Sequence, residues 1–507
     1  MWQPLKQLLE RTGRKPRRGR RRSALARLTR NLPSLYLALT AALAVLGYVW
    51  LLAFPILAIY CLVDLPDSVM AADGPLGWAT VAGEVVAAVF GTGVTVALLR
   101  LKPDRGDAGG IELQQSECPA LFEHLAALYT TYGASPAHRV TLTGEMAVTM
   151  GYVPLNGFPF APRLHLRIGL PLMAALSPEH AEGALARAIG QASLRHNRIT
   201  GWLHRLHEAW LQYAKLYRLQ PPKVRWLLQV CFLWYARLFT FAARYTVRRD
   251  ELEGDQYALD TVNDRVVVEL VSALTVYPRL LKERFWPPFW RLAYKHATPP
   301  MGPYSRLIQA LPTLLQRSEP QRWLTEAMRR DGDALQPGLA ERLDNIGHEH
   351  GHLPAATGGE TATAALLGAA LPNLCARLDK SWLRGHLAEW QQRHTKYQRE
   401  LQVLKTLNAR AQRGALEPRE AWMHARLVAK HLDKSAAVPL FKRLVSEHPD
   451  DAAQLLEAGR LLLSCGEPAG VTALEHAMAL DARCRTQAMR LIAAYRGHTG
   501  GSAADAA

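Results

Sequence analysis

Cysteine is scarce in this chain, with six residues among 507, and no two of them form a Cys-x-x-Cys pair. That spacing argues against a cysteine zinc site and against a disulfide framework, and it indicates a reducing compartment for the soluble part. A disorder-prone composition is also missing, since 49% of the residues are hydrophobic and 21% are charged. The length exceeds that of one ordinary core, so two or more domains are expected.

Acidic residues are almost missing from the N-terminal segment. Residues 1–31 carry eleven Lys or Arg but only one acidic residue, Glu10, and so supply +10 of the formal net charge of +17. A basic tail directly before a hydrophobic run more often fixes membrane orientation than binds nucleic acid. We therefore expect a basic cytoplasmic tail and no nucleic-acid partner.

Two apolar runs follow the tail, Leu32–Leu62 and Trp78–Leu99. Both are long enough for the ~20 helical residues that span a ~30 Å hydrocarbon core. The stretch between them, Asp64–Gly77, is expected to be a short polar connection. Glu84 in the second run is expected to face a partner helix or the interface, because a lone carboxylate is unfavourable in lipid.

Basic residues precede the first run and follow the second at Arg100 and Lys102. The positive-inside rule then places both the N-terminus and everything after Arg100 in the cytoplasm. The expected localisation is a bacterial inner membrane, with two or more spans, a cytoplasmic main domain and membrane lipid as a partner. A third apolar run, Trp226–Ala243, is marginal as a span because Arg237 interrupts it, and a buried or membrane-surface helix is favoured.

The most informative stretch for function is Leu185–His196. Ser177 and the proline after it are typical of a helix start, and the helix is expected to run into the low 200s. Positions 187 and 191 lie on one face of such a helix. A zinc peptidase has His-Glu-x-x-His at this spacing, whereas this chain has Arg187, Ala188 and Gln191.

The order of these features resembles the membrane zinc metallopeptidases of the HtpX and CAAX prenyl protease type, over roughly residues 30–350. In that family the central helix reads Leu-x-His-Glu-Leu-Gly-His. The third zinc ligand there is the Glu of an Arg-x-x-Glu-x-x-Ala-Asp phrase, which looks like Arg248–Asp255 here, so Glu251 and Asp255 match the ligand and its accompanying Asp. Gly254 replaces the usual Ala. Pro337–Leu343 looks like the family's later His-Pro-Ser-Leu-x-x-Arg-Leu segment, with the His and Ser altered.

The resemblance implies a mainly α fold with N-terminal transmembrane helices and a gluzincin-like α+β domain. Half-buried strands are predicted at Arg139–Thr143 and Leu164–Ile168 from their alternation of apolar and polar residues. Near the C-terminus a helical pattern recurs with a period of about 33, close to the tetratricopeptide spacing. The expected domains are therefore a basic tail (1–31), two transmembrane helices (32–102), a metallopeptidase-like domain (103–400) and a tetratricopeptide-like helical domain (401–500).

The departures from the family motif bear on the chemistry. A catalytic zinc needs three protein ligands and an open position for water. Arg187 keeps its proton and cannot ligate a cation, Ala188 removes the general base, and Gln191 is at best a poor ligand. We therefore predict no catalytic residue at these positions, and an ion pair between Arg187 and Glu251 in place of the metal.

A literal His-Glu-x-x-His does occur downstream, at His348, Glu349 and His352. The glycines and proline around it predict a loop rather than a helix, so it is interpreted as a His-rich surface loop. The other candidates for a rebuilt metal site are His196, His204 and His207. His204 and His207 are three apart on a predicted helix, and such a pair is more simply explained as partly exposed or core-packed than as metal-ligating.

Three functions remain open. The favoured hypothesis is a catalytically inactive, membrane-anchored pseudopeptidase that binds or regulates a protein or peptide partner through the former cleft or the repeats. The second is an active zinc metalloendopeptidase with an atypical ligand set, built from Glu251 with His196, His204 or His207, or from the His348 loop. The third is a scaffold in which only the repeats matter. No cofactor is expected, except zinc under the second hypothesis.

Overall fold

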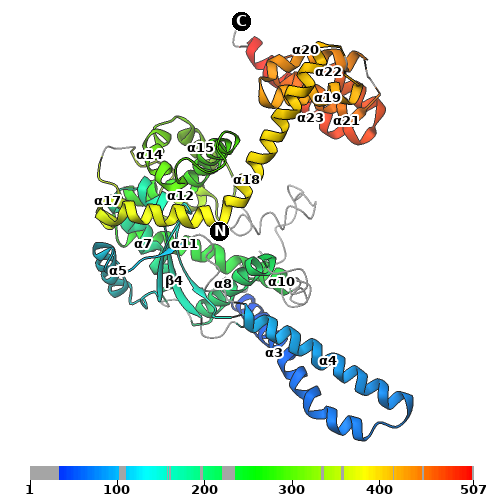
Figure 1. Cartoon of the computed structure of the whole chain (residues 1–507). Coiled ribbons are helices and arrows are strands. Elements are labelled where there is room, and N and C mark those ends of the chain that lie inside the picture. The colour runs from blue at the N-terminus through cyan, green and yellow to red at the C-terminus, as the bar shows by residue number, and fades with distance from the viewer. Residues whose placement is uncertain are drawn as a thin grey trace. The chain divides into compact units, whose positions relative to one another are not determined.

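The computed structural model describes residues 33–101, 110–156, 158, 162–193, 198–219, 235–332, 336–355, 359–414, 416–447 and 450–504. The described chain is mainly helical and contains a small mixed sheet, which confirms the fold class at that level (Figure 1). It divides into two compact units: residues 1–289 with 300–386, and residues 290–299 with 387–507.

The first unit begins with an antiparallel helical hairpin, α3 (Pro33–Met70) and α4 (Gly74–Arg100). Both helices are long and apolar enough to cross a membrane. The predicted polar connection Asp64–Gly77 is wrong, because α3 continues to Met70 and only residues 71–73 separate the helices. Ser68 donates a hydrogen bond to Glu84 at 2.9 Å, so the polar residues in this stretch belong to the helix pair. Glu84 thus faces the partner helix, as predicted.

The sheet has the strand order β1-β2-β4-β3. Its strands are β1 (Ile111–Glu112), β2 (Arg139–Thr143), β3 (Val148–Val153) and β4 (Arg163–Gly169). β2 and β4 pair in parallel, whereas β1 and β3 are antiparallel to their neighbours. The two strands expected from alternation, β2 and β4, are confirmed, and they are the central pair.

Helices precede and follow the strands. They are α5 (Pro119–Tyr132), α6 (Leu170–Ala175), α7 (Pro178–Ala192), α8 (Arg198–Leu219), α10 (Tyr235–Ala242), α11 (Arg244–Leu259) and α12 (Asp264–Leu280). Of these, α7 and α8 contact β3 and α6 contacts β4. After a π-helical turn (Leu281–Phe285), α13 (Trp286–Arg291) and a 3-10 turn (Leu292–Tyr294), the chain continues through α14 (Pro303–Leu315), α15 (Glu319–Met328), α16 (Leu339–Asn345) and α17 (Ala362–Leu367). The central helix α7 contacts β3, α11, α12, α5 and α17.

The helix α7 begins as predicted and ends earlier than predicted. The Ser177 hydroxyl accepts a hydrogen bond from the His180 amide, which caps the first turn. The expectation that it runs into the low 200s is wrong. Ser193 leaves the helix with an extended backbone, and its hydroxyl donates to the carbonyl of Gly190 at 2.7 Å. His196 lies outside the described residues, and His204 and His207 fall on α8.

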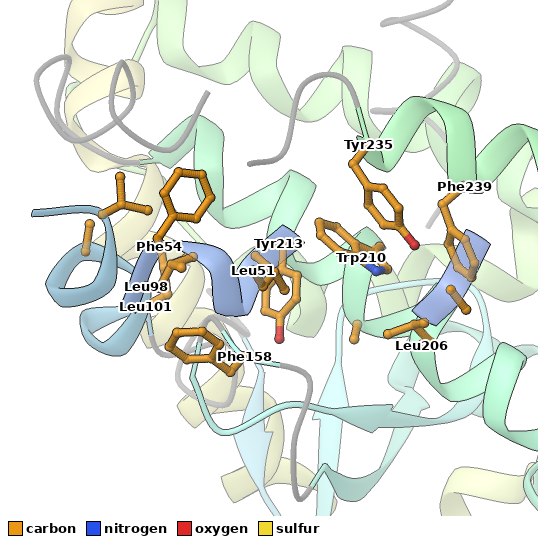
Figure 2. Packing of buried hydrophobic residues seen from close by; sticks show 14 of the residues in the cluster. Leu51, Phe54, Leu98, Leu101, Phe158, Leu206, Trp210, Tyr213, Tyr235 and Phe239 are labelled. Atoms are coloured by element: carbon orange, nitrogen blue, oxygen red, sulfur yellow. The ribbon is translucent and has the colours of Figure 1, made fainter. Parts of the chain in front are cut away.

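An apolar cluster joins the hairpin to the rest of the first unit (Figure 2). The α3 side contributes Leu51 and Phe54, and α4 contributes Leu98. They pack with side chains of α8 and α10, chiefly Trp210, Tyr213, Tyr235 and Phe239. The described part of the third apolar run is therefore a short helix with one face packed on this cluster.

The second unit is formed by a run of antiparallel helices. The long helix α18 (Leu371–Gln412) enters it and is followed by α19 (Pro418–His431), α20 (Lys434–Glu447), α21 (Ala452–Ser464), α22 (Ala469–Leu480), a 3-10 turn (Ala482–Cys484) and α23 (Arg485–Ala504). The first helices of two successive pairs, α19 and α21, begin 34 residues apart, at 418 and 452. Residues 290–299 join this unit through stacking of Tyr294 on Tyr397 and contact of Trp290 with Trp390.

Candidate functional site

The candidate site lies between α7 and α11, where two glycines let the helices approach closely. A β-carbon at Gly190 would lie 2.6 Å from the β-carbon of Tyr257, and one at Gly254 would lie 2.7 Å from Cδ of Gln191. Because larger residues would separate the helices at these points, the seam between them depends on the glycines. The seam brings the 187 and 191 positions of α7 against the 251 and 255 positions of α11.

The Arg187 guanidinium reaches across this seam to both acidic positions. One of its terminal nitrogens pairs with Glu251, and its Nε donates to Oδ1 of Asp255 at 2.9 Å. Arg187 is buried, and burial alone would lower its pKa. The charges of Glu251 and Asp255 outweigh that effect and hold the pKa above its ordinary value. The predicted pairing of Arg187 with Glu251 is confirmed, and Asp255 joins it.

Asp255 is the most deeply buried member of the site, with none of its surface exposed. It accepts from a second arginine, Arg342 of α16, through Nε at 2.8 Å and a terminal nitrogen at 2.6 Å. Burial alone would raise the pKa of the Asp255 carboxyl, but Arg342 and Arg187 outweigh it and hold the pKa below its ordinary value. One buried carboxylate is thus shared by two guanidinium groups, which is the pairing that a buried charge requires.

Gln191 and Ala188 occupy the other two positions that were compared with His-Glu-x-x-His, and both make contacts within the protein. Gln191 Nε2 donates to the backbone carbonyl of Asp250 at 2.9 Å, and Ala188 is buried. Gly254 leaves the space that the Gln191 side chain occupies. A glycine at position 254 therefore has a local physical reason.

A second set of contacts joins α11 to the segment around α16. Arg248 pairs with Glu341 and donates to the Gln336 carbonyl at 3.3 Å. Asn345 Nδ2 donates to the Leu252 carbonyl at 3.0 Å. Pro337–Leu343 was compared with a later segment of the metallopeptidase family, but no role was predicted for Arg342. The signal that could have found it was the Arg-Leu pair within Pro337–Leu343, which matches the family's segment together with Pro337 and Leu339.

The donor set does not fit a zinc ion. Within reach of the 187 position the structure offers two carboxylates, and both are held by guanidinium groups. Among the residues that the structure describes, no group of three or more His, Cys, Asp or Glu side chains is arranged to hold a metal. The stretch His348–His352 is non-helical, as predicted, and follows Gly347 with its φ of +80°. His207 is buried on α8 beside Phe239.

A second buried polar cluster lies on the opposite end of α7. The hydroxyl of Ser177 lies 2.7 Å from Nδ1 of His180, whose Nε2 lies 3.0 Å from a carboxylate oxygen of Glu269 on α12. Glu269 also accepts from Arg265 at 2.9 Å. The cluster caps the first turn of α7 and connects α7 to α12, so a structural role accounts for its geometry.

Comparisons with protein-family models, with curated proteins and with solved structures find no match for this chain. The chemistry of its own residues is therefore the basis for proposing a function.

Proposed function

We propose that this protein is a membrane-anchored pseudopeptidase of the HtpX and CAAX prenyl protease type. In this proposal α3 and α4 anchor the chain, α7 and α11 retain the helix pair of a zinc peptidase, and the protein acts by binding or regulation. The proposal is supported chiefly by Arg187, whose guanidinium occupies the space between the helices and pairs with the carboxylate at the position of the third ligand, Glu251.

The physical argument is one of charge. A zinc site would place a dication between α7 and α11, with two neutral imidazoles and one carboxylate as ligands. Arg187 supplies a permanent positive charge at the first of these positions, and Arg342 supplies another against Asp255. Two cations and two anions balance one another, so no uncompensated negative charge is left to offset the cost of desolvating a buried dication.

The test is metal analysis of the purified full-length chain in detergent. The unaltered protein is expected to contain no stoichiometric zinc and to leave an unfolded substrate such as casein intact. The variant Arg187→His/Ala188→Glu/Gln191→His is expected to bind about one zinc per chain, in a manner that Glu251→Gln abolishes. Stoichiometric zinc in the unaltered chain that is lost on Glu251→Gln would support the active-peptidase alternative instead.

A scaffold role is the second candidate, and the helix pairs of the second unit favour it. α19 with α20 and α21 with α22 stack in succession, and Gly459 and Gly470 let α21 and α22 approach closely. Stacked helix pairs of this kind present extended binding surfaces. If only the repeats matter, charge substitutions at the exposed Leu432 and Leu480 would abolish partner binding, whereas Arg187 variants would leave it intact.

A further inference from the structure

The two hairpin helices differ in length, since α3 has 38 residues and α4 has 27. The way they are aligned shows at which end α3 is the longer. Gly91 of α4 packs on the Phe54 carbonyl of α3, where a β-carbon would lie 2.8 Å away. Because the helices are antiparallel, Arg100 at the end of α4 lies level with α3 about nine residues before this contact, near Val45. Residues 33–44 of α3 therefore extend past the end of α4 on the side of its basic terminus.

α10 covers one face of this extension. The Tyr36 hydroxyl donates to the Ala242 carbonyl, and the Tyr235 hydroxyl donates to the Leu43 carbonyl at 2.8 Å. The Tyr235 ring lies against Gly47, where a β-carbon would come 2.7 Å from Cε1. Figure 2 shows Tyr235 and Phe239 directed from α10 into the cluster.

Both segments also expose large apolar side chains. On α10, Leu238 is 52% exposed and Phe241 is 48% exposed, although Tyr235 and Phe239 already bury the opposite face. On the extension, Leu39 is 54% exposed. Large apolar side chains exposed side by side indicate contact with apolar material. This exposed surface continues the lipid-facing surface of the hairpin, since α10 contacts α3 directly.

We propose that α10 and residues 33–44 of α3 form an interfacial shoulder embedded in the cytoplasmic leaflet, with Leu238 and Phe241 inserted among the lipid acyl chains. This inference rests on the proposed membrane anchoring. The partner is lipid, because the surface is continuous with a hairpin that is long and apolar enough to cross a membrane, and because the exposed Arg100 ends α4 at the level of the shoulder. Basic residues beside an apolar helix face are typical of attachment to anionic lipid.

The test uses the full-length chain in liposomes of phosphatidylcholine and phosphatidylglycerol. Nitroxide labels are placed singly at Leu238→Cys and Phe241→Cys, with Cys231, Cys465 and Cys484 replaced by Ser. Collision with oxygen, which concentrates in lipid, is compared with collision with a water-soluble nickel chelate. Val86→Cys on the exposed face of α4 is the lipid reference, and Leu432→Cys on α19's C-terminal flank is the aqueous reference.

Oxygen collisions are expected to exceed nickel collisions at 238 and 241, as at 86, and the order is expected to reverse at 432. Nickel dominance at 238 and 241, with 86 still in lipid, would overturn the shoulder while leaving the membrane anchor intact. Nickel dominance at all positions would remove the anchor itself. Exclusion of both reagents, with spin–spin broadening between chains, would show that a second copy covers the shoulder and would also overturn the proposal.

Discussion

The side chain of Gln191 fills the space that a β-carbon at Gly254 would need, since that atom would lie 2.7 Å from Cδ of Gln191. The two residues therefore depend on each other. Gln191 donates to the Asp250 carbonyl from the space that a side chain at position 254 would need, so an alanine there would displace it.

This dependence predicts a change of sign. Gly254→Ala is expected to destabilise the unaltered chain by about 1–2 kcal/mol, because Gln191 is displaced and its hydrogen bond is lost. In a Gln191→Ala background the same substitution is expected to stabilise by up to about 1 kcal/mol through helix propensity. Gly385→Ala, in an open position on α18, is the control and should stabilise in both backgrounds. Thermal unfolding of the four combinations measures the coupling, and additive effects would contradict it.

The two arginines on Asp255 predict an order of severity. Arg342→Met and Arg187→Met each leave buried carboxylate charge with one partner fewer, and each is expected to destabilise by about 3–5 kcal/mol. Glu251→Gln is expected to be milder, at about 1–2 kcal/mol, because 30% of that side chain is exposed and water can solvate it. Denaturant unfolding in detergent gives these differences. A Glu251→Gln effect larger than that of Arg342→Met would contradict the assignment of Asp255 as the centre of the network.

The lowered pKa of Asp255 predicts an acid-sensitive fold. A carboxyl whose pKa is lower in the folded than in the unfolded chain contributes stability above its ordinary value of 3.8, and that contribution is lost as pH falls through the folded value. The unfolding free energy of the unaltered chain is therefore expected to fall as the pH drops below about 5. Asp255→Asn should be less stable at neutral pH and should show a shallower decrease on acidification. Parallel pH profiles for the two proteins would count against this role.

The proposed anchoring predicts the sidedness of the hairpin. The turn at residues 71–73 is expected to face the outside and the second unit the cytoplasm. A membrane-impermeant thiol reagent should modify Ala71→Cys in intact cells, whereas Met423→Cys should react only after permeabilisation. Both positions are exposed in the structure, so a failure to react reflects the membrane and not burial. The reverse pattern would invert the topology and also the interpretation of the basic tail.

Much of this architecture follows from local sequence signals. Ser177 and Pro178 determine where α7 begins, and the alternation at Arg139–Thr143 identifies a central strand, because caps and face periodicity are read within a few residues. The pairing of Arg187 with Glu251 was predictable from their opposite charges and from the resemblance of the two segments that carry them to metallopeptidase motifs. The edge strand Val148–Val153 was not predicted, since its burial alternates imperfectly around Gly151.

Arg342 shows where such reasoning stops. The Arg-Leu pair within Pro337–Leu343 draws attention to Arg342 but does not identify its partner, because the contact with Asp255 joins positions 87 residues apart. Likewise the extension of α3 to Met70 includes a contact of Ser68 with Glu84 across the hairpin. These contacts are set by tertiary packing, which a pattern in one short segment does not contain.

Because Asp255 is shared between two arginines, single substitutions that would begin to build a metal site are expected to destabilise the protein. Replacing Arg187 by His alone would leave Glu251 without its guanidinium and Asp255 with Arg342 only. Replacing Gln191 alone would discard the hydrogen bond that Gly254 makes possible. Each of these single substitutions lowers the free energy of unfolding, and no metal is bound yet to compensate for the loss. A chain with this pair of arginines is therefore expected to keep it.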